Sequence, residues 1–298
     1  MTEIEAYLAV KREVVDRSLD KWIPPAETPP ATLHEAMRYS IFAGGKRLRP
    51  ILCLAAAEAV GGDEAQAMPA ACALECIHTY SLIHDDLPAM DDDDVRRGQP
   101  TSHKVFGEAM AILAGDALLT HAFRLMADPA LYAAPVEPGV LVEVVRTVSE
   151  AAGAAGMVGG QVADLEAEGR EVDAEALTYI HTHKTAALIR ASVVAGGLLG
   201  GGSAEAVEAL GRYGSSVGLA FQIVDDILDV VGDEATLGKA VGADEAHDKA
   251  TYPGVFGLEA SRAEADRLVE DACRALEPLG EGGALLKELA RFVVSRRR

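Results

Sequence analysis

The sequence reads Asp85-Asp86-Leu87-Pro88-Ala89-Met90-Asp91 at the end of one largely apolar stretch and Asp225-Asp226-Ile227-Leu228-Asp229 at the end of another. Acidic side chains seek water, so three of them at each of two such places are costly to bury unless a cation neutralises them. Carboxylate oxygens without nearby cysteine pairs suit hard cations, and Mg²⁺ is commonly shared between carboxylates and substrate phosphates. The two clusters therefore predict a Mg²⁺ site for a diphosphate.

The two clusters differ in spacing. Asp225 and Asp229 are four residues apart, so on a helix they project to one side, with Gln222 one turn earlier. The first cluster has two extra residues and a proline, and its outer aspartates would point about 240° apart on an ideal helix. We therefore expect that helix to end near Pro88 and Asp91 to lie on the following loop.

The acidic residues also allow two other interpretations, a solvated surface loop and a calcium site. Asp91 to Asp94, taken alone, also fit a solvated surface loop, and the second cluster is what favours a metal site. A calcium loop of the EF-hand type does not fit, because alternate positions from Asp91 reach Val95 where an oxygen ligand is required.

Length and composition predict one large helical domain. The 298 residues contain no linker-like stretch, so we expect a single domain spanning 1–298. Apolar residues make up 49% and aromatic residues only 5%, and no convincing run of alternating β-branched residues occurs, which favours an all-α fold. The formal charge of -20 argues against a nucleic-acid partner.

The cysteines and the N-terminal stretch indicate the compartment. The four cysteines (Cys53, Cys72, Cys76 and Cys273) lie in alanine-rich segments without metal-ligand spacing, as expected of buried thiols in a reducing cytosol. No stretch of eighteen uncharged apolar residues occurs. We predict a cytoplasmic protein with neither signal peptide nor membrane span.

Apolar periodicity between glycine and proline breakers predicts helices at 2–20, 31–43, 48–60, 67–86, 103–127, 138–155, 173–198, 203–231, 259–277 and 283–296. The segments 109–119 and 191–199 are apolar nearly all round, which predicts helices at the centre of a large bundle.

Basic residues recur in short polar motifs beside the apolar stretches. The motifs are Gly44-Gly45-Lys46-Arg47-Leu48-Arg49-Pro50, Arg96-Arg97-Gly98 and His183-Lys184-Thr185. Arginine offers a planar fork to phosphate oxygens and lysine a compact positive charge. No P-loop is present, because Arg47 follows Gly-Lys where Ser or Thr is needed. Each motif alone is typical of a solvated helix end, and only their occurrence with the aspartates favours diphosphate binding.

These motifs together resemble the trans-polyprenyl diphosphate synthases, in particular the bacterial farnesyl diphosphate synthase group. The resemblance covers nearly the whole chain. Besides the motifs already quoted, the matching segments are 78–84, 91–98, Gly159-Gly160-Gln161, Phe221-Gln222, Leu237-Gly238-Lys239 and Lys249-Ala250-Thr251-Tyr252-Pro253.

The resemblance implies a large antiparallel helical bundle around a central cavity, with Mg²⁺ ions between the two aspartate motifs. By motif position the metal ligands would be Asp85, Asp86, Asp91, Asp225, Asp226 and Asp229. The residues at the allylic diphosphate would be Arg96, Lys184 and Lys239, which would act in catalysis, with Thr185 and Gln222. Isopentenyl diphosphate would be held by Lys46, Arg49, His78 and Arg97. Lys249 would bind substrate as well, although Asp248 stands before it where a glycine is common.

The implied reaction is condensation of isopentenyl diphosphate with C5 and C10 allylic diphosphates, through an allylic carbocation, to give farnesyl diphosphate. Tyr80 resembles the aromatic residue that short-chain members place below the first aspartate motif, so we expect Tyr80 and Ser81 to set a C15 product. A core tyrosine without this role remains an alternative. We expect Asp116 and Asp164 to make structural hydrogen bonds only, and Arg296-Arg297-Arg298 to be a solvated tail or to help close the site.

Three alternatives remain. A C20 product would make the chain a geranylgeranyl diphosphate synthase. A terpene cyclase would carry a different second metal motif and would not need the basic residues for a second diphosphate. A catalytically silent prenyl-diphosphate binding protein would be expected to lose an aspartate or a basic residue, and none is lost here. The resemblance also implies a homodimer.

Overall fold

The structure is a computed structural model that describes residues 2–170, 172–231 and 250–295. Within these residues its regular secondary structure is helical apart from one hairpin of two-residue strands, which confirms the all-α fold. The chain divides into two compact units, Met1–Ile51 with Met68–Val136, and Leu52–Ala67 with Glu137–Arg298. A single domain over 1–298 stays a prediction.

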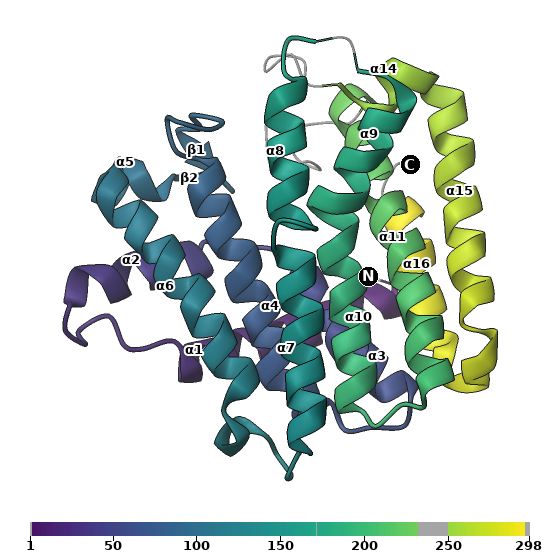
Figure 1. Cartoon of the computed structure of the whole chain (residues 1–298), viewed down its shortest axis with the longest axis horizontal. Helices are drawn as coiled ribbons and strands as arrows, with labels where there is room; N and C mark the ends of the chain where they lie inside the picture. Colours follow the sequence, from purple (N-terminus) through teal and green to yellow (C-terminus); the bar gives the residue numbers. More distant parts are fainter. Residues whose placement is uncertain (1, 171, 232–249, 296–298) are drawn as a thin grey trace. The chain divides into compact units, whose positions relative to one another are not determined.

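The first unit carries the first aspartate cluster. Helix α2 packs against α5 and α6, and α1 begins with a capping box between Thr2 and Glu5. Figure 1 shows this part of the chain in purple to blue. Its elements are α1 (Glu3–Trp22), α2 (Ala31–Ile41), the start of α3 (Leu48–Ala59), most of α4 (Glu64–Asp85), β1 (Val95–Arg96), β2 (Gln99–Pro100), α5 (Ser102–Phe106), α6 (Glu108–Ala127) and η1 (Pro129–Leu131).

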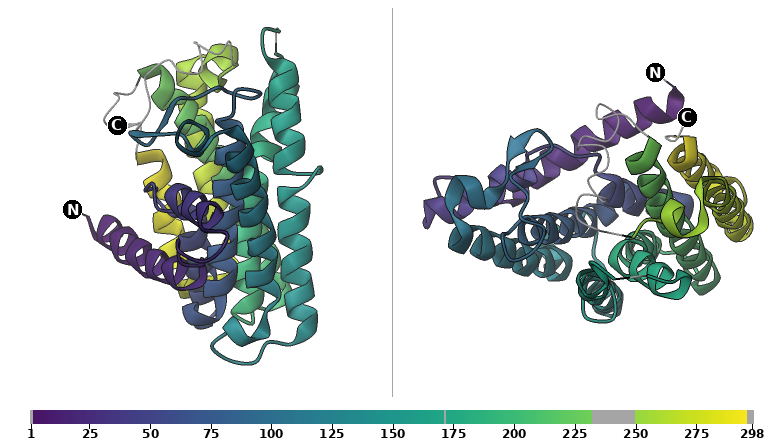
Figure 2. Two further views of the ribbon diagram at one scale, coloured as in Figure 1. Left: turned by 90° about the vertical axis from the view of Figure 1, so that its left-hand side faces the viewer. Right: turned by 90° about the horizontal axis from the view of Figure 1, so that it is seen from above.

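The second unit carries the second aspartate cluster. Helix α10 packs against α7 and α11, and α11 packs against α15, as Figure 1 and the end-on view in Figure 2 show. The elements are α7 (Pro138–Ala152), α8 (Met157–Ala167), α9 (Ala174–Ile180), η2 (His181–Ala186), α10 (Ala187–Leu199), α11 (Ala204–Val231), α14 (Tyr252–Phe256), α15 (Leu258–Ala275), η3 (Glu277–Gly283) and α16 (Ala284–Ser295).

Apart from shifted helix ends and the short segments η1 and η3, which were not predicted, the predicted helices differ from the observed ones in four places. Helices α8 and α14 were missed, the predicted helix 103–127 is divided at Gly107, and the predicted helix 173–198 contains the π-helical segment η2. Gly159 and Gly160 make the α8 sequence look like a loop, because glycine is a poor helix former. In the structure they lie inside a helix.

The two segments predicted to be central helices behave differently. Helix α10 is buried along most of its length, as predicted. The central position predicted for helix α6 is wrong, because this helix buries only one face. Ile112 and Leu113 on its other side are 43% and 52% exposed. Among the described helices α6 is also the one that is long and apolar enough to cross a membrane, by length and composition alone. No other element of the described residues packs over Ile112 and Leu113 of α6 closely enough to bury them.

A buried ion pair ties α4 to the segment before α3. Arg47 is 3% exposed and Glu75 is 2% exposed, and Arg47 Nη1 lies 2.7 Å from Glu75 Oε1. The same guanidinium donates to Asp16 Oδ1 and to the carbonyl of Ile41, both at 2.7 Å. Arg47, which was quoted with the basic motif, is therefore fully used by protein acceptors.

We predict that Glu75→Ala lowers the free energy of unfolding by about 2–3 kcal/mol, because it leaves Nη1 of a buried guanidinium without an acceptor, while Asp16 still opposes the charge of Arg47. Urea unfolding followed by circular dichroism measures this. Glu150→Ala is the matched control, since the exposed Arg146–Glu150 pair should contribute about 1 kcal/mol or less. Equal effects of the two substitutions would contradict the prediction.

Candidate functional site

The first aspartate cluster folds into a closed turn at the end of α4. The helix ends at Asp85, and the backbone N–H of Asp91 donates to the Asp85 carbonyl at 2.8 Å. The prediction that the helix ends before Pro88 and that Asp91 lies on a loop is confirmed. Asp85 and Asp91 are half-buried, whereas Asp86 is 3% exposed.

Asp86 and Arg96 neutralise each other. Arg96 Nε donates to Asp86 Oδ1 at 2.6 Å, and a second guanidinium nitrogen lies 3.3 Å from Asp93 Oδ2. Burial raises the pKa of Asp86 to about 6, and the adjacent guanidinium opposes that shift. The charges of Asp86 and Arg96 already balance each other. A ligand that separates this pair must therefore supply a cation for the carboxylate and an anion for the guanidinium.

A tight turn presents Arg96 and Arg97 beside each other. Strands β1 and β2 pair antiparallel with Val95 opposite Pro100, and the two turn residues, Arg97 and Gly98, have φ of 55° and 77°. A type I′ turn requires positive φ at both positions, and glycine accommodates it best. Tyr39 Oη anchors the hairpin by donating to the Pro100 carbonyl at 2.7 Å. A pocket beside it is lined by Tyr39, Thr79, Asp86, Arg96 and Arg97, among others.

His78 lies among guanidinium groups in the same unit. It is half-buried, and its pKa is held well below 6.5, first by desolvation and then by the positive charges of Arg49 and Arg97. Arg97 donates to the Gly44 carbonyl, and Lys46 nearby in the sequence is exposed. The structure thus gathers His78, Arg49 and Arg97, predicted to hold a second diphosphate, and makes the histidine a neutral hydrogen-bonding group.

The two residues predicted to set product length lie on α4 before Asp85. Tyr80 is 6% exposed, and its ring meets the His84 ring edge to face at 5.7 Å between centroids. Ser81 Oγ donates to the His78 carbonyl at 2.9 Å and is half-buried. Tyr80 is therefore a packed aromatic side chain less than two turns before the aspartate cluster.

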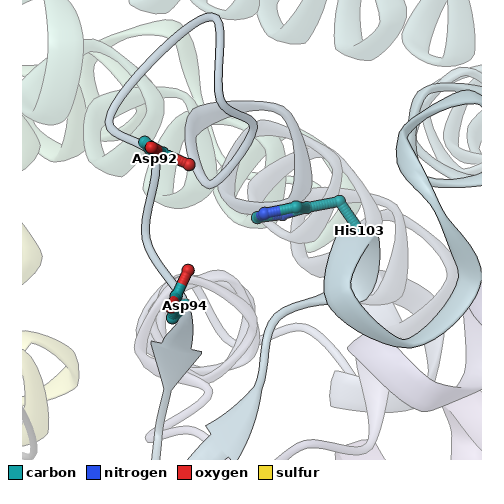
Figure 3. A group of neighbouring side chains, drawn as sticks. All are labelled: Asp92, Asp94 and His103. Atoms are coloured by element: carbon teal, nitrogen blue, oxygen red, sulfur yellow. The ribbon is translucent and has the colours of Figure 1, made fainter.

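A second acidic group, missed from the sequence, lies after the first cluster. The ligand atoms of Asp92, Asp94 and His103 are within 4.8 Å of one another, and Figure 3 shows the histidine ring directed toward the two carboxylates. Lys104 Nζ lies 2.6 Å from Asp94 Oδ1, and both aspartates are exposed. A cation here would have to displace this ammonium group, so the cluster is already neutralised in part.

The second cluster lies near the end of α11. Asp225 is half-buried, whereas Asp226 and Asp229 are 3% and 2% exposed. Gln222 Nε2 donates to Asp226 Oδ1 at 2.9 Å, and Thr185 Oγ1 donates to Gln222 Oε1 at 2.7 Å. The structure therefore connects Thr185 and Gln222 to the second aspartate cluster through Asp226, and their role at the allylic diphosphate stays a prediction.

Lys184 comes from the π-helical segment η2, which packs against α8. Its Nζ lies 2.6 Å from Asp164 Oδ2, so the predicted structural role of Asp164 takes the form of an ion pair between α8 and η2. A Cβ on Gly160 would lie 2.2 Å from the backbone nitrogen of Lys184. Glycine at that position is thus required for the close approach. Single-turn π segments inside α-helices are frequent at functional sites.

Gln161 on α8 is a further candidate that the sequence reasoning quoted only as part of a motif. Both polar atoms of its side-chain amide are buried, and neither has a hydrogen-bond partner in the described part of the chain. A buried amide without partners is costly unless a ligand or water satisfies it. The predicted ligands Lys239 and Lys249, and the tail 296–298, lie outside the described residues.

The donor set fits Mg²⁺. Both clusters offer carboxylate oxygens, and Arg96 lies within ion-pair distance of Asp86 in the first cluster. Lys184 lies in the same unit as the second cluster and pairs with Asp164, which is outside that cluster. Hard cations prefer such oxygen ligands, and the basic side chains suit the phosphate oxygens that Mg²⁺ commonly shares. The residues present therefore fit a Mg²⁺-diphosphate complex.

The polyprenyl synthetase family model matches residues 30–278. The chain belongs to this family. A farnesyl diphosphate synthase of Geobacillus stearothermophilus is 46% identical over 293 residues, which cover 98% of both chains. The large subunit 1 of a heterodimeric geranylgeranyl pyrophosphate synthase from Arabidopsis thaliana is 53% identical over 270 residues, 90% of this chain and 72% of that one.

A solved structure also resembles this polyprenyl synthetase chain. Geranyltransferase from Helicobacter pylori, complexed with magnesium and isoprenyl diphosphate, is 33% identical with a TM-score of 0.83, and the match covers 99% of this chain and 97% of that one. The resemblance stated from the sequence motifs is thus confirmed at the level of the family.

We predict that Gly160→Ala lowers the free energy of unfolding by about 1–3 kcal/mol, because the new methyl group must push η2 away from α8. Gly139→Ala is the control, since a Cβ there meets no atom within 4 Å. Thermal unfolding of both variants measures the difference. Equal melting temperatures would show that the close approach of α8 and η2 is not needed.

The lowered pKa of His78 predicts a pH dependence of stability. The unfolded chain takes up a proton on this residue below pH 6.5 and the folded chain does not, so stability falls as the pH drops below 6.5. The slope from this one group is at most about 1.4 kcal/mol per pH unit. His78→Gln removes it, so the variant should lose less stability than the parent between pH 6.5 and 5. Parallel curves from urea unfolding would refute the assignment.

Proposed function

We propose that this polyprenyl synthetase condenses isopentenyl diphosphate with C5 and C10 allylic diphosphates to give farnesyl diphosphate and diphosphate, with Mg²⁺ as cofactor. The proposal rests on one observation, the presence of two chemically different groups of diphosphate-binding side chains. One consists of the aspartate clusters with a basic residue in the unit of each, Arg96 beside Asp86 in the first unit and Lys184, paired with the structural Asp164, in the second. The other is basic, with Arg49 and Arg97 around a neutral His78. A condensing enzyme needs both, one for each substrate.

Each residue then has a defined task. Lys184, Arg96, Thr185 and Gln222 bind the allylic diphosphate and stabilise the charge that develops on it as it leaves. When bound, Mg²⁺ supplies further electrostatic stabilisation of that leaving group through the aspartates. Lys46, Arg49, Arg97 and His78 hold the second substrate, whose alkene attacks the allylic carbocation. A proton is then lost from the condensed cation to the departed diphosphate, so no side-chain nucleophile is required.

The metal and the first substrate are supported by a relative. The Helicobacter pylori geranyltransferase binds magnesium and isoprenyl diphosphate, and this chain has the oxygen donors and basic partners for the same pair. As a neutral imidazole, His78 has one N–H group with which it donates a hydrogen bond to an oxygen of the second diphosphate.

The C15 product is the finer part of the proposal. It is supported by Tyr80, a buried ring before Asp85, and by similarity to the farnesyl diphosphate synthase of Geobacillus stearothermophilus. A C20 product is the second candidate, because the Arabidopsis relative at 53% identity is a geranylgeranyl synthase subunit. The two products differ in the room that the chain gives the growing tail.

Homodimerisation is proposed on the exposed apolar face of α6. Ile112 and Leu113 are adjacent exposed apolar residues on this helix, and a contiguous exposed apolar patch is typical of a protein interface. We expect light scattering after size exclusion to give twice the chain mass, and Leu113→Lys to give the single chain. A single-chain mass for the parent protein would overturn this part.

The reaction is tested by incubating the purified protein with Mg²⁺, isopentenyl diphosphate and each of the C5, C10 and C15 primers, and by measuring chain lengths after dephosphorylation. We expect farnesol from the two short primers and little extension of the C15 primer. Cyclised hydrocarbons or no turnover would overturn the condensation.

We predict that Tyr80→Ala shifts the products toward C20, because it removes a ring of six carbons from the path proposed for the tail. Tyr80→Phe is the control and should keep the C15 profile, since it retains the ring. The alcohols are separated by chromatography after dephosphorylation. An unchanged C15 profile for Tyr80→Ala would remove Tyr80 from this role.

A further inference from the structure

Asp226 receives donors from three different segments of the second unit. Its Oδ1 accepts from Gln222 Nε2 at 2.9 Å, and its Oδ2 accepts from the backbone N–H of Tyr252 at 2.7 Å. His181 Nε2 lies 3.3 Å from the same Oδ2. Asp226, His181 and Tyr252 are 3%, 5% and 9% exposed. The carboxylate therefore joins α11, η2 and the first residue of α14 in the interior of the unit.

The contact with Gln222 extends to Thr185. A side-chain amide has a donor end and an acceptor end, and here the donor end faces Asp226 while the acceptor end receives Thr185 Oγ1 at 2.7 Å. The carboxylate thus fixes which way the amide points. His181 and Thr185 lie near opposite ends of η2, so both ends of the π segment that carries Lys184 are tied to one aspartate.

The neighbouring aspartate has a different environment. Consecutive residues on a helix point about 100° apart, so Asp225 and Asp226 address different surroundings. Asp225 is half-buried, whereas Asp226 is almost fully buried against protein donors. A carboxylate offers about four lone-pair directions, and the protein itself supplies donors toward three of those of Asp226.

We propose that Asp226 is a positioning residue and not a metal ligand: through Gln222 and His181 it holds the π segment so that Lys184 and Thr185 face the allylic diphosphate. This inference departs from the sequence prediction, which grouped Asp226 with the metal ligands, and it rests on the proposed function for the identity of the diphosphate. Asp225 and Asp229 then carry the metal-binding role of the second cluster.

The test compares two adjacent substitutions of the same chemistry, Asp226→Asn and Asp225→Asn. Binding of Mg²⁺ in the presence of inorganic diphosphate is measured by calorimetry, and the melting temperature with and without this pair by circular dichroism. For Asp225→Asn we expect binding of Mg²⁺ to weaken about 10–100-fold. For Asp226→Asn we expect binding within twofold of the parent and a lower melting temperature in the absence of ligand. If Asp226→Asn weakened the binding of Mg²⁺ tenfold or more, the inference would be overturned.

A purely structural role is distinguished by steady-state kinetics well below the melting temperature. Asp226→Asn should lower kcat about 10–100-fold while the KM for isopentenyl diphosphate stays the same. Unchanged kcat with a lower melting temperature would assign the residue to folding alone and overturn positioning. Thr185→Val should lower kcat as well. The double variant Asp226→Asn/Thr185→Val should have a kcat no lower than that of the less active single variant, because both substitutions break the same chain of contacts. A kcat reduced by the product of the two single effects would count against the inference.

Two further measurements keep the inference testable. If Asp226→Asn does not fold, His181→Phe keeps the ring shape and removes one of the three donors, and it should lower kcat with unchanged Mg²⁺ binding. Loss of Mg²⁺ binding in that variant would contradict the inference. If the parent protein makes no prenyl product, the proposed function fails, while calorimetry with Mg²⁺ and inorganic diphosphate still shows which aspartate binds metal.

Discussion

A carboxylate inside a helical bundle must have a counter-charge or several hydrogen-bond donors, and this constraint shapes both units. In the first unit Glu75 is matched by Arg47 and Asp86 by Arg96. In the second, Asp164 is matched by Lys184 and Asp226 by His181 with two further donors. Apart from Gln222, which lies on the same helix as Asp226, each partner comes from another segment of the same unit. The polar groups that suit a ligand therefore also hold helices together.

These pairs fall into two kinds. Arg47 and Glu75 are almost fully buried, and Arg47 has further protein acceptors, so no phosphate is needed to satisfy it. Arg96 and Lys184 are 32% and 27% exposed at the side chain and keep donors that a ligand can reach. Exposure therefore separates the basic residues that stabilise the fold from those that suit a substrate, although the sequence shows them in similar motifs.

Much of the site could be predicted from the sequence because its chemistry is local. The proline after Asp86 predicted the helix end, and the four-residue spacing of Asp225 and Asp229 follows from helix geometry. The partners of Asp226 could not be predicted, since His181 and Tyr252 are remote in sequence and meet only through packing. Helix α8 was missed for a related reason: its glycines are unfavourable for a helix alone, and the backbone of η2 is what requires them. The exposed face of α6 was missed because an apolar sequence does not reveal which side of a helix is covered.

The π-helical segment η2 has a consequence for the register of the helical run it interrupts. A π bulge widens one turn of a helix and so resembles the insertion of a single residue. Residues of α9 and α10 are therefore out of phase by about 100° relative to an uninterrupted helix. Deleting one residue between His181 and Ala186 would restore regular winding and cancel this offset, so both ends of the run would keep the sides that they face now. The irregular turn thus sets the phase in which two halves of one rod present their faces, and a uniform helical wheel drawn across it assigns one half to the wrong side.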